Sequence, residues 1–82
     1  MKEDNIDEAL KQVQLFFKLA MGNSVEVGID TEKNMISEWD SINHLNLIVE
    51  MESALDLGLS MEEIEKLSSV RQIVELIKSR KG

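Results

Sequence analysis

Residues 39–48 read Trp39-Asp40-Ser41-Ile42-Asn43-His44-Leu45-Asn46-Leu47-Ile48, and this stretch decides the fold. Its apolar residues recur at helical spacing, so we expect an amphipathic helix that starts at Ser41 and ends near Leu55. Asp40 is the expected N-cap, because a carboxylate there can accept a hydrogen bond from a free N–H of the first turn. Ser41 is then the first residue of the helix.

The apolar surface of this helix is wider than one core-facing stripe. At 100° per residue it spans an arc of about 220°, roughly twice what burial on one side requires. Two interpretations remain open. Either the long preceding loop covers the extra width, or the arc divides into a core side (Leu47, Ile48, Met51 and Leu55) and an exposed docking stripe ringed by acids. The candidate partner-docking residues are Ile42, Leu45, Val49, Glu50 and Glu52.

Ser41 lies where a helix offers unpaired N–H groups and the positive end of its dipole, which suits a phosphate group. Serine is also a common capping residue, so the residue types alone favour a structural role. His44 is the only histidine, and we expect it to be partly buried with a hydrogen bond near Trp39 or the loop. Trp39 is expected to anchor that loop. No metal site is expected, since the other nitrogen or sulfur ligands are missing.

The N-terminal part predicts one helix and one long loop. The helix is expected from Asn5 to Met21, on an apolar stripe that comprises Ile6, Ala9, Leu10, Val13, Phe16, Phe17 and Ala20. Residues 23–39 contain alternating Val25, Val27 and Ile29, but no second alternating segment exists to pair with them as a strand. We therefore expect an ordered loop whose apolar side chains pack against the helices. A connection this long is often functional.

The C-terminal part predicts two more helices, each opened by a capping box. Ser60 with Glu63 begins a short helix that continues through Ile64 and Leu67. Ser69 with Gln72 begins a last helix, whose apolar residues are Val70, Ile73, Val74 and Ile77. The methionines at positions 21, 35, 51 and 61 are expected to fill the core. The fold class is all-α, a bundle of three longer helices and one short helix in a single domain, residues 1–82.

Composition narrows the class of function. A chain of 82 residues leaves little room for a catalytic cleft, and we expect no enzyme. The net charge of −7 makes nucleic acid and anionic membranes unfavourable partners. There is no cysteine, which fits a reducing cytoplasm. No signal peptide or membrane span is expected, and we expect a monomer. Eight acidic residues and no Lys or Arg lie between Lys33 and Lys66, which indicates a docking face for basic partners.

The run from Trp39 to Ile48 resembles the attachment segment of the acyl carrier protein family, and the likeness continues in order through residues 61–67 and 69–74. The resemblance implies a four-helix bundle. It also implies that a phosphopantetheinyl transferase attaches 4'-phosphopantetheine to Ser41, with Asp40 and Ile42 completing the motif. The arm's thiol would carry acyl groups between a loading ligase or synthase and acyltransferase enzymes with basic docking surfaces, in fatty-acid or polyketide biosynthesis.

Three departures from the family pattern favour a specialised carrier over a housekeeping one. Ile42 replaces the usual leucine after the serine, and the early helix carries Asn43, His44 and Asn46 where carriers of fatty-acid synthesis tend to have acids. Trp39 precedes the motif, where peptidyl carriers usually have a glycine-rich segment. Alternatives remain: a carrier of aminoacyl or peptidyl groups, or an unmodified helical module that uses the acidic face for binding. A hydrolase that pairs Ser41 with His44 lacks an evident third orienting group and oxyanion pocket.

Overall fold

The computed structural model describes the backbone of residues 2–81 and the side chains of residues 8–80. It contains four α-helices, α1 (Lys2–Met21), α2 (Ser41–Leu55), α3 (Met61–Lys66) and α4 (Val70–Lys81), and a 3-10 helix, η1 (Lys33–Met35). No β-strand occurs within residues 2–81. The predicted all-α bundle with one short helix is therefore confirmed.

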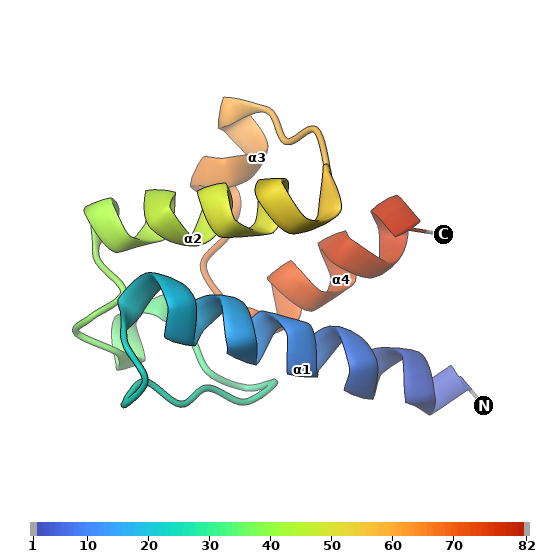
Figure 1. Cartoon of the computed structure of the whole chain (residues 1–82), viewed down its shortest axis with the longest axis horizontal. Helices are drawn as coiled ribbons and strands as arrows, with labels where there is room; N and C mark the ends of the chain where they lie inside the picture. Colours follow the sequence, from blue (N-terminus) through green and yellow to red (C-terminus); the bar gives the residue numbers. More distant parts are fainter. Residues whose placement is uncertain (1, 82) are drawn as a thin grey trace.

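Helix α1 is the base of the bundle. It packs against both α2 and α4, which lie on the same side of it, and the start of α1 and the end of α4 lie toward the same end of the molecule (Figure 1). The core is built where these three long helices meet, because each turns its apolar stripe inward. Its largest fully buried side chains are Val13, Phe17, Leu47, Met51, Val70, Ile73, Val74 and Ile77.

The loop between α1 and α2 is ordered, as the sequence predicted. Val25 and Val27 are buried against the helices, and the side-chain amide of Gln14 donates to the Val27 carbonyl at 2.8 Å. Farther along, Glu32 and Ser69 form an isolated antiparallel bridge, in which Lys33 N–H donates to the Ser68 carbonyl at 2.8 Å. The loop is thus fixed to both α1 and the start of α4.

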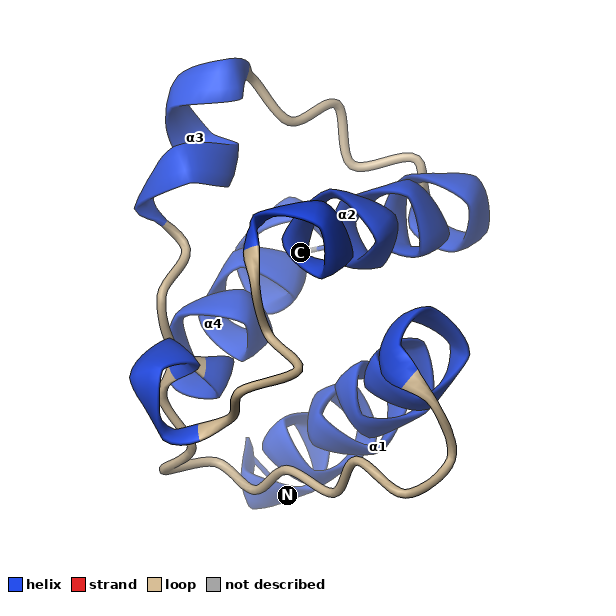
Figure 2. Cartoon of the chain, turned by 90° about the vertical axis from the view of Figure 1, so that its left-hand side faces the viewer, coloured by secondary structure: helices blue, strands red, loops and turns tan. Residues whose placement is uncertain are grey.

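Helix α3 stands at the outer edge of the bundle, joined to α2 by an extended connection (Figure 2). Its cap is the predicted capping box: Ser60 Oγ accepts from Glu63 N–H at 3.1 Å, and the Glu63 carboxylate accepts from Ser60 N–H at 3.0 Å. None of its six residues is buried. Leu67, which directly follows it, is buried and anchors its end.

Two expectations need correction. Helix α1 begins at Lys2 rather than Asn5, because the acidic residues that precede Asn5 suit the first turn of a helix. The side chain of Ile6 lies outside the described residues. Met35 and Met61 do not fill the core: they are 69% and 64% exposed, and each lies in a short helix, η1 or α3, that contains no buried residue.

Candidate functional site

The predicted attachment motif, residues 40–42, lies at the junction of the long loop and α2. Asp40 is extended (φ −97°, ψ −173°) and its Oδ1 accepts from Asn43 N–H at 2.9 Å, so it is the N-cap. Ser41 is the first residue of α2 and is exposed to solvent. The helix therefore presents Ser41 at its positive end, where first-turn N–H groups lack helical acceptors.

The hydroxyl of Ser41 differs from those of the other serines at helix starts. Ser60 Oγ accepts from Glu63 N–H at 3.1 Å, and Ser69 Oγ accepts from Gln72 N–H at 3.2 Å. Among residues 8–80, Ser41 Oγ forms no hydrogen bond with a protein atom, because Asp40 has taken the capping role. The chain thus places an exposed, uncommitted hydroxyl at the mouth of a 15-residue helix.

The junction before Ser41 is held by side chains from α2 itself. Asn43 Nδ2 donates to the Glu38 carbonyl at 2.8 Å, and its Oδ1 accepts from Asn46 Nδ2 at 3.2 Å. The amide groups at 43 and 46, which set the sequence apart from a more acidic helix start, therefore shape the turn into α2.

His44 is buried at 6% exposure and uses both ring nitrogens. Its Nδ1 accepts from Trp39 Nε1–H at 2.8 Å, so Nδ1 carries no proton, and Nε2 donates its proton to the Ile64 carbonyl at 2.8 Å. The predicted hydrogen bond to Trp39 is confirmed. A hydrolase pair with Ser41 is disfavoured, because neither ring nitrogen is free to act as a base.

Trp39 anchors the loop, as predicted. Its side chain is 2% exposed, and its ring packs edge-on against Phe17 of α1 with ring centroids 4.8 Å apart. The indole stacks toward the His44 imidazole at a centroid distance of 6.0 Å. The residue two positions before Ser41 is therefore fixed to the core.

The wide apolar arc of α2 divides into two faces. Leu47, Ile48 and Met51 are buried, and Leu55 is half-buried against the core. On the other face Ile42 is 72%, Val49 61% and Leu45 52% exposed. The loop does not cover these three side chains, so of the two open interpretations the exposed stripe is the one that the structure contains.

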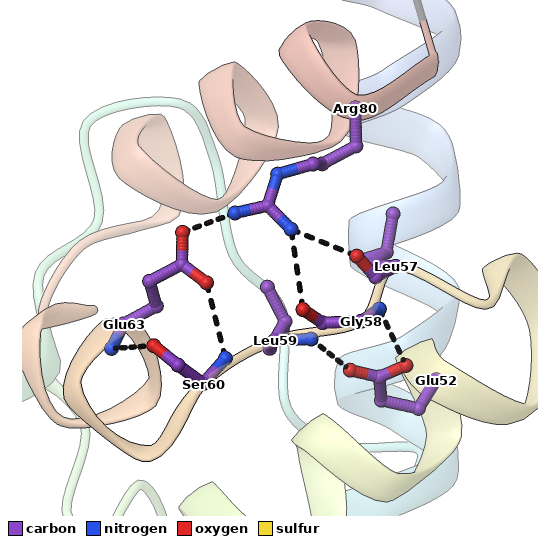
Figure 3. Close-up of polar contacts among 7 residues, drawn as sticks. All are labelled: Glu52, Leu57, Gly58, Leu59, Ser60, Glu63 and Arg80. Atoms are coloured by element: carbon purple, nitrogen blue, oxygen red, sulfur yellow. Dashed lines mark hydrogen bonds and ion pairs between the residues drawn. The ribbon is translucent and has the colours of Figure 1, made fainter.

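The two glutamates placed beside the stripe are half-buried, and Glu52 has a structural contact (Figure 3). Its carboxylate accepts from Gly58 N–H at 3.1 Å and Leu59 N–H at 2.7 Å. These two bonds hold the pKa of Glu52 below the ordinary value of 4.5. Glu52 therefore closes the α2–α3 connection in addition to contributing negative charge, whereas Glu50 has no such bond within residues 8–80.

A second set of polar contacts, which the sequence did not indicate, joins α4 to α3 through the carboxylate of Glu63 (Figure 3). The Arg80 guanidinium pairs with Glu63 and also donates to the Leu57 carbonyl at 2.8 Å. The backbone bond from Ser60, followed by the charge of Arg80, lowers the pKa of Glu63 below 4.5. One cation of the basic tail is thus used inside the fold rather than toward a partner.

The chain was compared with family models and with solved protein structures. No family model matches the chain. The chain is similar to the solution NMR structure of a holo acyl carrier protein from Geobacter metallireducens, at 27% sequence identity and a TM-score of 0.78. The similarity covers 89% of this chain and 85% of that one. No helix within residues 2–81 is long and apolar enough to cross a membrane.

Proposed function

We propose that this chain, which belongs to the acyl carrier protein family, holds acyl groups as thioesters on a 4'-phosphopantetheine arm bonded to Ser41. The protein is a carrier rather than an enzyme. The observation that carries the proposal is the exposed hydroxyl of Ser41 at the start of α2, left uncommitted because Asp40 caps the helix. A phosphodiester there would lie at the positive end of the helix, which favours it electrostatically.

The absence of cysteine from the sequence agrees with this chemistry. A thioester needs a thiol, and the arm supplies it, so the polypeptide itself needs none. Asp40 contributes by fixing the first turn, and Ile42 contributes an apolar surface next to the modified serine. The donor of the arm is coenzyme A and the enzyme that transfers it is a phosphopantetheinyl transferase.

The exposed stripe of Ile42, Leu45 and Val49, with Glu50 and Glu52 beside it, is the proposed docking face. Its apolar centre and acidic rim suit a partner that presents an apolar pocket ringed by lysine or arginine. Such partners are the transferase, an acyl-loading ligase or synthase, and acyltransferases. The amide and imidazole side chains at 43, 44 and 46 stand where carriers of fatty-acid synthesis tend to have acids, which supports a specialised pathway. The absence of cysteine is consistent with a cytoplasmic location.

The decisive experiment is co-expression with a broad-specificity phosphopantetheinyl transferase, followed by intact mass. We expect the mass of one phosphopantetheine on the wild-type chain and none on Ser41→Ala. Ser53→Ala, an exposed serine of the same helix, is the matched control and should be modified normally. An unmodified wild-type chain, or a modified Ser41→Ala chain, contradicts the proposal. An unmodified chain that still binds partners through α2 would indicate the helical interaction module.

The class of cargo is a separate question. Incubating the modified protein with acyl-loading and aminoacyl-loading ligases, and following the added mass, separates an acyl carrier from an aminoacyl carrier. We expect acyl loading. Loading by aminoacyl enzymes alone would assign the protein to the second class while leaving the role of Ser41 intact.

A further inference from the structure

Helix α3 depends on a few contacts with the rest of the molecule. A six-residue helix is too short to be stable by itself, and none of its residues is buried. Its apolar anchors are the partly buried Ile64, which packs against the core, and the buried Leu67 at its end. Besides these and its own capping box, two polar contacts from other helices hold it. Arg80 of α4 pairs with Glu63, and His44 of α2 donates to the Ile64 carbonyl.

The His44 contact is one half of a chain of hydrogen bonds. In a neutral imidazole, Nε2 can donate to the Ile64 carbonyl only in the tautomer whose Nδ1 is unprotonated. An unprotonated Nδ1 is also the acceptor that the Trp39 indole N–H requires. Each bond therefore favours the tautomer that the other needs. One neutral imidazole links α3 to the residue two positions before Ser41.

The other end of the chain is the junction that presents Ser41. Trp39 N–H donates to the Ile36 carbonyl at 3.1 Å, and its indole is fixed by Phe17 and His44. The neighbouring Glu38 carbonyl is held by Asn43. Of the two α2 side chains that hold this junction, His44 is the one that also reaches α3.

We propose that His44 is a positioning residue that couples α3 to the junction carrying Ser41. A partner that displaces α3 removes the acceptor of Nε2–H and thereby frees the imidazole to change tautomer or rotate. The Trp39 indole then loses its acceptor, and the backbone that leads into Ser41 loosens. Partners that contact α3 can in this way alter how Ser41 is presented. The link to Ser41 chemistry rests on the proposed function, whereas the coupling itself is a property of the unmodified chain.

The coupling is tested by amide hydrogen exchange on the Ser41→Ala chain, which cannot carry the arm. The amides of Ile64 and Leu67, which donate within α3, report on α3, and those of Val13 and Val74 report on the core. The shorter side chain of His44→Asn keeps an acceptor for the Trp39 indole, near the position that Nδ1 occupies in the wild type, but has no group that reaches the Ile64 carbonyl. We expect its α3 amides to exchange about five- to tenfold faster, the effect of one lost hydrogen bond, with core amides within twofold.

Two further variants separate coupling from simple contact loss. His44→Gln keeps a donor that reaches Ile64, so we expect α3 exchange close to that of the parent chain and faster exchange of the Trp39 indole N–H. Trp39→Phe leaves the His44–Ile64 contact untouched, yet coupling predicts about threefold or greater acceleration in α3. If Trp39→Phe leaves α3 exchange unchanged, or if the α3 and core amides of all variants accelerate by the same factor, the proposal is overturned.

The consequence for Ser41 is measured on the chain that retains the serine. We expect Trp39→Phe and His44→Gln, which both lose the bond between residues 39 and 44, to lower kcat/KM for phosphopantetheine transfer about three- to tenfold, whereas His44→Asn, which keeps an acceptor for the indole, falls less. Equal rates for all variants would contradict the link to Ser41 presentation. If the wild-type chain accepts no phosphopantetheine at all, the proposed function fails while the exchange results still decide the coupling.

Discussion

Replacing Ile42 by alanine is expected to weaken binding of a partner enzyme about 20-fold without lowering the stability of the carrier. Ile42 is 72% exposed on the outer face of α2. The change removes three carbon groups, each of which contributes about 0.8 kcal/mol when buried. Scaled by the fraction of Ile42 that is still exposed, the loss is about 1.7 kcal/mol, or about 20-fold in Kd.

Val49→Ala gives a smaller effect on the same reasoning. The change removes two carbon groups from a side chain that is 61% exposed, so the expected loss of binding free energy is about 1 kcal/mol, or about fivefold in Kd. The two positions are seven residues apart on one helix, about 10 Å, so the double variant should lose about 100-fold. Neither change should lower the melting temperature, since alanine is a better helix former than either β-branched residue.

The assay is isothermal titration of the Ser41→Ala carrier with a phosphopantetheinyl transferase, because this background prevents turnover. Leu19→Ala is the matched control: Leu19 is a 58% exposed apolar side chain, but it lies on α1, outside the proposed docking face. Its Kd should stay within twofold of the parent chain. The reasoning is refuted if Ile42→Ala also stays within twofold, or if Leu19→Ala weakens binding as much.

Three further predictions concern the fold that supports the site. Gly58 has φ +66° with no atom within 4 Å of an added Cβ, so Gly58→Ala should cost about 1 kcal/mol through backbone strain alone and lower Tm by about 5 °C, whereas Gly28→Ala should not; equal melting temperatures would argue against the strain. The pKa values of Glu52 and Glu63 are lower in the folded than in the unfolded chain, so their stabilisation is fully present above about pH 4.5 and is lost as the pH falls through the lowered values. Urea unfolding should therefore show stability falling below pH 4.5, and a smaller fall in Glu52→Gln; an identical slope in that variant would contradict this. Ile73 is fully buried, so Ile73→Ala should cost about 3–4 kcal/mol in urea unfolding, and a loss under about 1 kcal/mol would show that the core repacks.

The elements and the attachment motif could be predicted from the sequence because they depend on local signals. Asp40 and Ser60 are caps whose partners lie three residues away. The alternating valines of the loop have no second strand to pair with, so the sequence predicts an ordered loop packed against the helices. Such signals are short-range, and the structure agrees with them to within a few residues.

The contacts around α3 could not be predicted in the same way. Arg80 lies 17 residues from Glu63 and 23 from Leu57, and which cation of the tail folds back is decided by how α4 packs. The sequence indicated a hydrogen bond between His44 and the nearby Trp39, but Ile64 is 20 residues from His44. Likewise, the sequence predicts only a docking role for Glu52, because no local signal indicates that its oxygens accept from the N–H groups of residues 58 and 59.

The burial of Trp39 has a practical consequence. It is the only tryptophan in the chain, so the intrinsic fluorescence of the whole protein arises from one indole located two residues before the candidate attachment serine. That indole is shielded from water, and its N–H is bonded to an imidazole. Emission wavelength and intensity therefore report on this one junction, and transferase binding, arm attachment and acyl loading can each be followed in real time without a label.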